Sequence, residues 1–197
     1  MGKTIHLQRV KEYIAKSPVV SFKSINRIIS QKKKVKQYGK QLIRNLIRQG
    51  KLKNLAKGYY TSWNDLSLTV FCFQPAYLGL QDALSYHNLW EQETIPVIIT
   101  TRKIRPGLRK IMGGNVLLRR IDQKYFFGLD YSKENNFALP YSDLEKTFLD
   151  LIHFKVKISP EVLKEFLHWM DYKRLNQYLN RYPLSFKKKV KQMISHK

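Results

Sequence analysis

The sequence predicts an α+β fold in two parts: a small, basic N-terminal part of helices and one hairpin, then a larger mixed α/β part that ends in helices. Two observations predict this division. The first 62 residues hold sixteen of the 37 Lys and Arg residues but only one of the fourteen acidic residues. Apolar residues also recur at helical spacing before residue 50, whereas short β-rich apolar runs begin only after residue 63.

Three helices are predicted in the basic part. Residues 5–15 place Leu7, Val10 and Ile14 on one face, and Pro18 follows the end of that helix. Ser21 is placed to cap a second helix. A third helix is predicted over residues 33–48, and its inward face consists of Val35, Tyr38, Leu42, Ile43, Leu46 and Ile47.

The opposite face of the third helix is basic and rich in amides. It carries Lys36, Gln37, Lys40, Gln41, Arg44, Asn45 and Arg48, and residues 29–63 contain no acidic residue. A solvated helix face usually mixes Glu with Lys, so this face repels itself unless an anion neutralises it. Guanidinium and amide groups have the geometry to bond base edges, and lysines pair with phosphates.

A basic hairpin is predicted after the third helix. Gly50 is placed as the helix C-cap, and Gly58 is the residue best able to take the left-handed position in a turn at residues 56–58. This order predicts an N-terminal winged helix-turn-helix over residues 1–63 that binds double-stranded DNA. RNA binding, non-specific binding and a purely structural helical bundle are the alternatives. The predicted DNA contacts are Lys32, Lys33, Lys34, Lys36, Gln37, Lys40, Gln41, Arg44, Lys53 and Lys57.

Residues 64–197 are predicted to form a mixed α/β domain, helical from about residue 142. Strands are expected at 66–73, 95–101, 115–121 and 124–130, a helix at 81–89, and a basic loop at 102–114. Ser142 and Glu145 form a capping-box pattern at the start of a further helix. Two or three more helices are expected after residue 158.

Four segments resemble the AbiEi-type antitoxins, transcriptional regulators of type IV toxin–antitoxin systems. They are "LAKGYYTSW", "AYLGLQDALSYHNLWEQETIPVIITTRK", "YFFGLD" and "LPYSDLEKTFLDLI", and the match runs from the winged helix to about Phe154. Asn88 stands where that family often has Gly. The resemblance implies a winged helix that represses its own operon at inverted repeats. It also implies an AbiEi-like C-terminal domain that counters a nucleotidyltransferase-type toxin without a stable complex, and no enzyme activity or cofactor.

A metal-dependent nuclease or RNA-binding protein is the alternative function. Nucleases of this kind need clustered carboxylates with a lysine, often as Glu-x-Lys, and that tripeptide does not occur. Asp122-Gln-Lys124 is the nearest substitute and is expected at a surface turn. The five histidines show no metal-ligand spacing, and Cys72 is the single cysteine. We therefore expect no metal site.

The N-terminal residues have no apolar run long enough for a signal peptide, and no segment is apolar enough to span a bilayer. A cytoplasmic protein without membrane contact is expected. The sequence leaves the oligomeric state open between monomers that bind cooperatively and a homodimer.

Overall fold

The computed structural model describes residues 2–29, 36–92, 94–132 and 137–195. Lys32, Lys33 and Lys34 lie outside the described residues, as does the expected start of the third helix. The chain divides into two compact units, Met1–Cys72 with Lys110–Asn115, and Phe73–Arg109 with Val116–Lys197. The sequence predicts a boundary after residue 63 between two independently folding domains, and that domain boundary stays a prediction.

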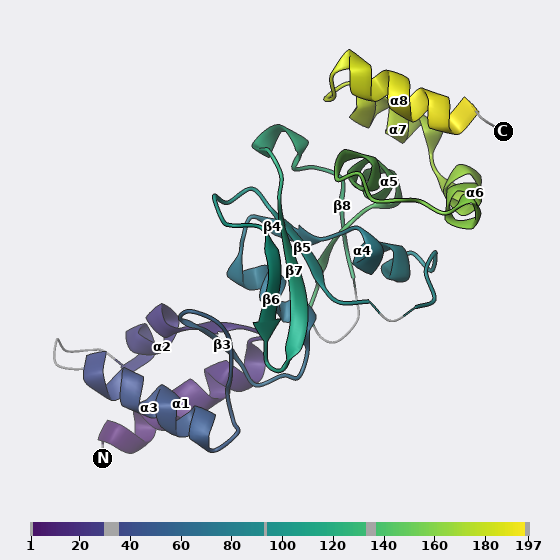
Figure 1. Ribbon diagram of the computed structural model, residues 1–197. Coiled ribbons are helices and arrows are strands. Elements are labelled where there is room, and N and C mark those ends of the chain that lie inside the picture. The colour runs from purple at the N-terminus through teal and green to yellow at the C-terminus, as the bar shows by residue number, and fades with distance from the viewer. Residues whose placement is uncertain (1, 30–35, 93, 133–136, 196–197) are drawn as a thin grey trace. The chain divides into compact units, whose positions relative to one another are not determined.

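The first unit contains the three expected helices and a small antiparallel sheet (Figure 1). Its helices are α1 (Gly2–Lys16), α2 (Phe22–Ile29) and α3 (Lys36–Arg48). Its strands are β1 (Val20–Ser21), β2 (Lys53–Ala56) and β3 (Tyr59–Thr61), in the order β1-β3-β2. Apolar faces of the three helices meet in one core of buried side chains, which includes Val10, Ile25, Ile43 and Leu46.

Local signals in the sequence define the ends of these elements. The Ser21 hydroxyl accepts a hydrogen bond from the backbone N–H of Ser24 at 3.0 Å, so the expected cap of α2 is confirmed. Gly50 follows α3 with φ +69°, and Gly58 turns the hairpin with φ +81°. Both angles lie in the left-handed region that glycine tolerates best. The two predicted glycine roles are therefore confirmed.

Two expectations for the first unit are wrong. Leu66–Cys72 forms a 3₁₀ helix, η1, and not a strand. The carboxylate of Asp65 accepts from the N–H of Ser67 at 2.8 Å, and this turn starts the helix. Ile47 is 39% exposed and does not belong to the inward face of α3. A short apolar run does not distinguish a strand from a helical segment that is buried on most sides.

The second unit contains most of a mixed six-stranded sheet in the order β6-β7-β5-β4-β9-β8 (Figure 1), while the end of β6 and the start of β7 belong to the first unit. The strands are β4 (Ala76–Leu78), β5 (Val97–Thr100), β6 (Gly107–Ile111), β7 (Gly114–Arg120), β8 (Leu129–Tyr131) and β9 (Pro140–Ser142). Strand β4 pairs antiparallel with β5 and parallel with β9, while β5 pairs parallel with β7. Strands β8 and β9 are antiparallel.

The α-helices in the described part of the second unit are α4 (Gln81–Tyr86), α5 (Leu144–His153), α6 (Pro160–Trp169), α7 (Tyr172–Leu179) and α8 (Leu184–Ser195). Side chains of the sheet and of these helices share one core, with Tyr77, Ile99, Phe148 and Phe166 fully buried. The predicted α+β class and the helical C-terminus are thus confirmed.

Three details of the second unit differ from the sequence expectations. The basic loop contains strand β6, which joins β7 in the sheet. The strand expected at 124–130 is a 3₁₀ turn, η2 (Gln123–Tyr125), followed after a gap by β8. The N-cap of α5 is Asp143, whose carboxylate accepts from the N–H of Lys146 at 2.8 Å, while Ser142 belongs to β9. Aspartate caps a helix as well as serine does. Because Ser142 is paired in strand β9, Asp143 is the residue left to cap α5.

Candidate nucleic-acid interface

The outward face of α3 is the first component of the candidate interface. The side chains of Gln37, Lys40, Gln41, Arg44 and Arg48 are all exposed in the structure. Their spacing of three, four, seven and eleven residues from Gln37 places them along one side of the helix. The amide of Gln41 donates to Asn45 Oδ1 at 3.4 Å, which is a weak contact. Gln41 stays exposed and Asn45 stays partly exposed.

A groove of about 360 Å³ runs between this face and the hairpin. Lys40, Arg44 and Lys57 contribute its cations, from the helix on one side and the hairpin turn on the other. Its remaining lining residues are Phe22, Ile43, Ile47, Asn54, Gly58 and Tyr60. Ile47 is exposed because it lines this groove. Helical periodicity alone does not show that position.

The hairpin is fixed to the helices by hydrogen bonds. The N–H of Phe22 donates to the carbonyl of Gly58 at 2.8 Å, so the turn is attached to the start of α2. The hydroxyl of Thr61 donates to the carbonyl of Pro18 at 2.7 Å, and β1 pairs with β3. The cation of Lys57 is therefore carried on a turn whose backbone is held relative to α3.

The structure brings together only some of the predicted contacts. Lys40, Gln41, Arg44 and Lys57 lie around the groove or on the same face of α3, and Gln37 extends that face. The ammonium of Lys53 instead donates to Asn64 Oδ1 at 3.0 Å. Lys36 begins α3, but its side chain is not described. The assignment of all these residues to DNA contacts stays a prediction.

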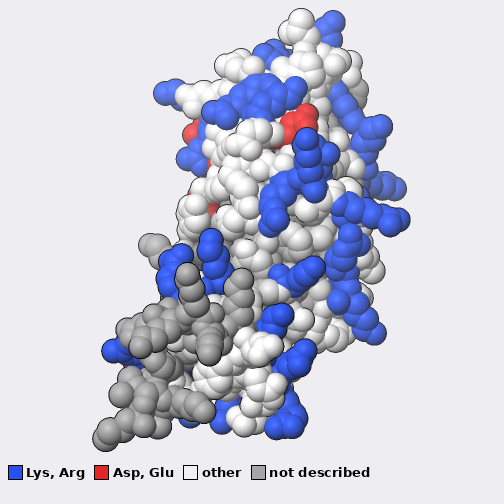
Figure 2. Space-filling model, turned by 90° about the vertical axis from the view of Figure 1, so that its left-hand side faces the viewer, with Lys and Arg blue, Asp and Glu red and all other residues white. Residues whose placement is uncertain are grey.

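Basic residues also dominate beyond this groove. Figure 2 shows Lys and Arg side chains at many places on one face of the protein, with few acidic side chains among them. The formal net charge of +23 is in agreement with this view. A surface of this composition attracts polyanions at long range, and the attraction weakens as salt is added.

A second polar constellation lies inside the second unit, around α5. Lys146 and Asp150 form an ion pair one helical turn apart, and both side chains are fully buried. Tyr77 on β4 donates to Asp150 Oδ2 at 2.7 Å and accepts from Lys146 Nζ at 2.9 Å. Desolvation lowers the pKa of Lys146, while the nearby Asp150 charge opposes that change. Burial, with Asp150 beside it, raises the pKa of Tyr77 well above its ordinary value.

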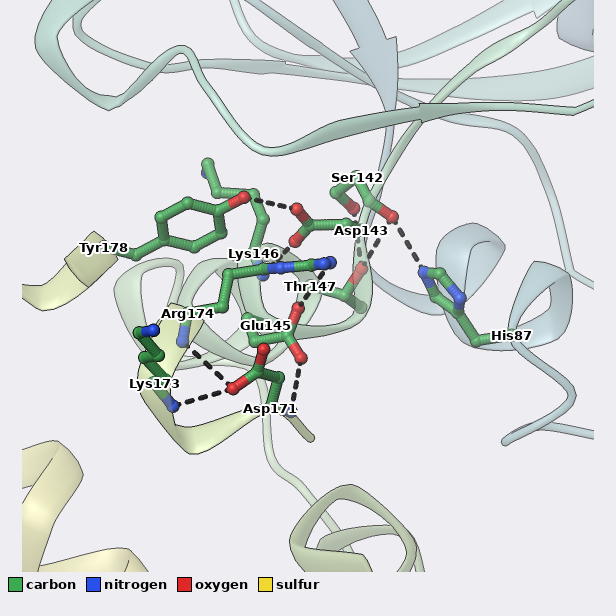
Figure 3. A network of polar contacts seen from close by, with 10 residues as sticks. All are labelled: His87, Ser142, Asp143, Glu145, Lys146, Thr147, Asp171, Lys173, Arg174 and Tyr178. Atoms are coloured by element: carbon green, nitrogen blue, oxygen red, sulfur yellow. Dashed lines mark hydrogen bonds and ion pairs between the residues drawn. The ribbon is translucent and has the colours of Figure 1, made fainter. Parts of the chain in front are cut away.

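The same helix is tied to α7 through two further carboxylates (Figure 3). Asp143 Oδ2 accepts from the Tyr178 hydroxyl at 2.6 Å. Glu145, 2% exposed, accepts from the N–H of Asp171 at 2.7 Å and from Arg174 at 3.5 Å. These carboxylates therefore bind protein donors at the junction of α5 and α7. The sequence predicted Glu145 only as part of a capping box and missed these contacts, which join residues 26 to 35 positions apart.

Asp122, the acidic residue nearest to a nuclease motif, does not lie with the carboxylates of α5. Glu145 bonds α7, Asp150 bonds Lys146 and Tyr77, and Asp122 is exposed at the turn before η2. Within the described ranges, no three His, Cys, Asp or Glu side chains are grouped so that they could hold a metal ion. His87 Nε2 donates to the carbonyl of Ser142 at 2.8 Å, which joins α4 to β9.

Comparison with known proteins identifies the fold. The structure is similar to the crystal structure of the RV2827C protein from Mycobacterium tuberculosis, with a TM-score of 0.63. The likeness covers 96% of this chain and 76% of that chain, at 15% sequence identity. At that identity the similarity shows a shared fold alone. Neither a protein-family model nor the sequence of a curated protein matches this chain significantly.

The described helices include none that is both long and apolar enough to cross a bilayer. The α3 face and its groove form one candidate surface for a large anionic ligand. It combines fixed cations on two elements with amides that can donate and accept. Such a surface can contact phosphates on both sides of the groove while the amides of α3 face outward.

Proposed function

We propose that this protein is a transcriptional regulator that binds double-stranded DNA through its first unit. The observation that carries the proposal is the outward face of α3, which is exposed and carries cations and amides but no acidic residue of its own. The expected partner of an uncompensated basic helix with a fixed hairpin beside it is a duplex, with the helix in the major groove.

In this proposal, the residues of the interface have two roles. Gln37, Gln41 and Arg44 contact base edges, because amide and guanidinium groups can form paired hydrogen bonds with adenine and guanine. Lys40 and Lys57 contact phosphates from opposite sides of the groove. The two lysines then position the helix, whereas the amides and Arg44 determine which sequence is preferred.

The finer proposal follows from the resemblance to AbiEi-type antitoxins. The protein represses its own operon at an inverted repeat, and its second unit counteracts a nucleotidyltransferase-type toxin without a stable complex. The buried ion pair of Lys146 and Asp150 lies within the segment "LPYSDLEKTFLDLI", one of the four that carry the resemblance.

Binding to the DNA upstream of the protein's own gene tests the proposal. Lys40→Ala and Lys57→Ala should weaken binding to every duplex and reduce the slope of log K against log salt by about 0.9 each. Arg44→Ala and Gln41→Ala should cost about 1–3 kcal/mol and relax the sequence preference. Lys11→Ala on α1 is the matched control, since Lys11 is exposed in the same unit but does not line the groove.

Equal affinity for scrambled DNA, or an equal loss with Lys11→Ala, would contradict sequence-specific binding through α3. The antitoxin part has a separate test in growth rescue from the toxin encoded beside the gene. The full-length Arg44→Ala variant should lose repression and keep rescue. A variant that loses both would argue against two separable functions.

A further inference from the structure

The last two helices form a second basic surface, in a different unit from α3. Residues 172–195 contain seven Lys and Arg residues and no Asp or Glu. The preceding Asp171 uses its carboxylate to cap α7, accepting from the N–H groups of Lys173 and Arg174 at 2.8 and 3.2 Å. The charge of this helix pair is thus uncompensated within its own segment, which favours an anionic partner.

A groove of about 560 Å³ between α7 and α8 concentrates part of this charge. Its lining consists of three lysines, three amides and one apolar side chain: Lys173, Lys187, Lys191, Asn176, Gln177, Asn180 and Leu179. None of these described lining residues is acidic. Within the groove, the ammonium of Lys187 donates to Asn180 Oδ1 at 3.5 Å, a weak and exposed contact. Two cations outside the groove have protein partners, since Arg174 bonds Glu145 and Arg181 lies 4.5 Å from the centre of the Phe127 ring.

Two exposed aromatic rings lie where α6 leads into α7. Trp169 is 65% exposed and Tyr172 is 44% exposed. Their polar atoms are engaged: Trp169 Nε1 donates to Glu165 at 3.1 Å, and the Tyr172 hydroxyl donates to the carbonyl of Leu167 at 3.0 Å. The rings are therefore oriented at the surface without being covered. Tyr172 precedes Asn176 by four residues, so both lie on the same side of α7.

We propose that the α7–α8 groove binds single-stranded RNA. The three lysines pair with successive phosphates, and an unpaired base stacks on the exposed ring of Tyr172. The amides of Asn176, Gln177 and Asn180 bond base edges and 2′-hydroxyl groups, since both an amide and a hydroxyl donate and accept. A duplex does not fit this chemistry, because its bases are stacked on one another and cannot reach the ring.

The test measures the affinity of the full-length protein for a fluorescent twelve-nucleotide RNA of mixed sequence. The same sequence as single-stranded DNA and as a DNA duplex provides the competitors. Lys173→Ala/Lys191→Ala should weaken RNA binding and reduce the salt slope by about 1.4, from about 0.7 for each lysine. Tyr172→Leu should weaken RNA binding about 5- to 100-fold.

The matched control is Lys188→Ala/Lys189→Ala, which removes the same charge from exposed positions on α8 that do not line the groove. A loss in the control as large as in the groove variant would overturn the proposal. Single-stranded DNA or duplex DNA competing as well as RNA would overturn it too. Duplex binding in all these variants reports on the first unit separately, so failure of the RNA proposal is distinguishable from failure of the DNA proposal.

Discussion

Replacing Lys146 with Met is the sharpest test of the buried network. The substitution keeps most of the side-chain volume and removes the positive charge. Asp150 then keeps its hydrogen bond from Tyr77 at 2.7 Å but loses its ion pair, and its side chain is fully buried. Removing one member of a buried pair leaves an uncompensated charge, which costs about 3–5 kcal/mol.

Removing both charges should cost less than removing one. In Lys146→Met/Asp150→Leu both members of the ion pair are gone, so neither leaves the other unpaired, and the main loss is the hydrogen-bond partners of the Tyr77 hydroxyl, about 1–3 kcal/mol. The double variant should therefore be more stable than Lys146→Met. This sign reversal separates an ion-pair effect from a simple packing defect, because a packing defect would make the double variant worse.

Urea unfolding gives the free energies, with hydrogen exchange at α5 as the local measurement, since a chain of two compact units can unfold in more than one transition. Lys164→Met on α6 makes the same chemical change at an exposed position and should stay within about 0.5 kcal/mol of the unaltered protein. The reasoning is refuted by a Lys146→Met cost below about 1 kcal/mol, or by a double variant less stable than the single one.

Three further outcomes are expected. Gly58→Ala should lower the free energy of unfolding in urea by about 1–2 kcal/mol, because the φ of Gly58, +81°, is left-handed. The variant should also weaken duplex binding. Unchanged stability would show that the turn adopts another conformation. Tyr178→Phe should cost about 1–3 kcal/mol, since buried Asp143 loses a 2.6 Å hydrogen bond, and a neutral result would mean that water replaces the hydroxyl. Burial raises the pKa of Cys72 from 9.0 to about 12. The neutral thiol therefore contributes to the free energy of unfolding, and this contribution is complete below pH 9 and is lost as the pH rises toward 12. Iodoacetamide should accordingly modify Cys72 slowly at pH 8.5 in the folded protein and quickly in urea; rapid modification of the folded protein would contradict this burial.

The first unit could be predicted from the sequence because its signals are local. Ser21, Gly50 and Gly58 act within a few residues of themselves, through a cap, a helix end and a turn. The buried residues of α3 recur at helical spacing, so the basic face opposite them follows from periodicity. A local signal of the same kind occurs in the second unit at Asn88, whose φ of +58° is left-handed. After Gly, Asn is the residue that tolerates that region best.

The sequence predictions that the structure contradicts fall where one local pattern is compatible with two structures. Leu66–Cys72 is apolar enough for a strand or a helix, and a turn at Asp65 decided for the 3₁₀ helix. Ser142 and Asp143 can both cap a helix, and the pairing of Ser142 with Leu129 in the sheet left Asp143 for the role. Ile47 is one residue beyond the buried stripe of α3, and only the position of the hairpin shows that it lines a groove.

By itself the sequence determined the α+β class, the order of the N-terminal elements and the basic face of α3, because each depends on composition or on spacing along one element. The tertiary structure alone decided which cations share a groove, that Lys146 and Asp150 are buried against Tyr77, and that α7 and α8 form a second basic groove. Those features join residues far apart in the chain, and side-chain contacts at such separations follow from packing, which no local pattern encodes.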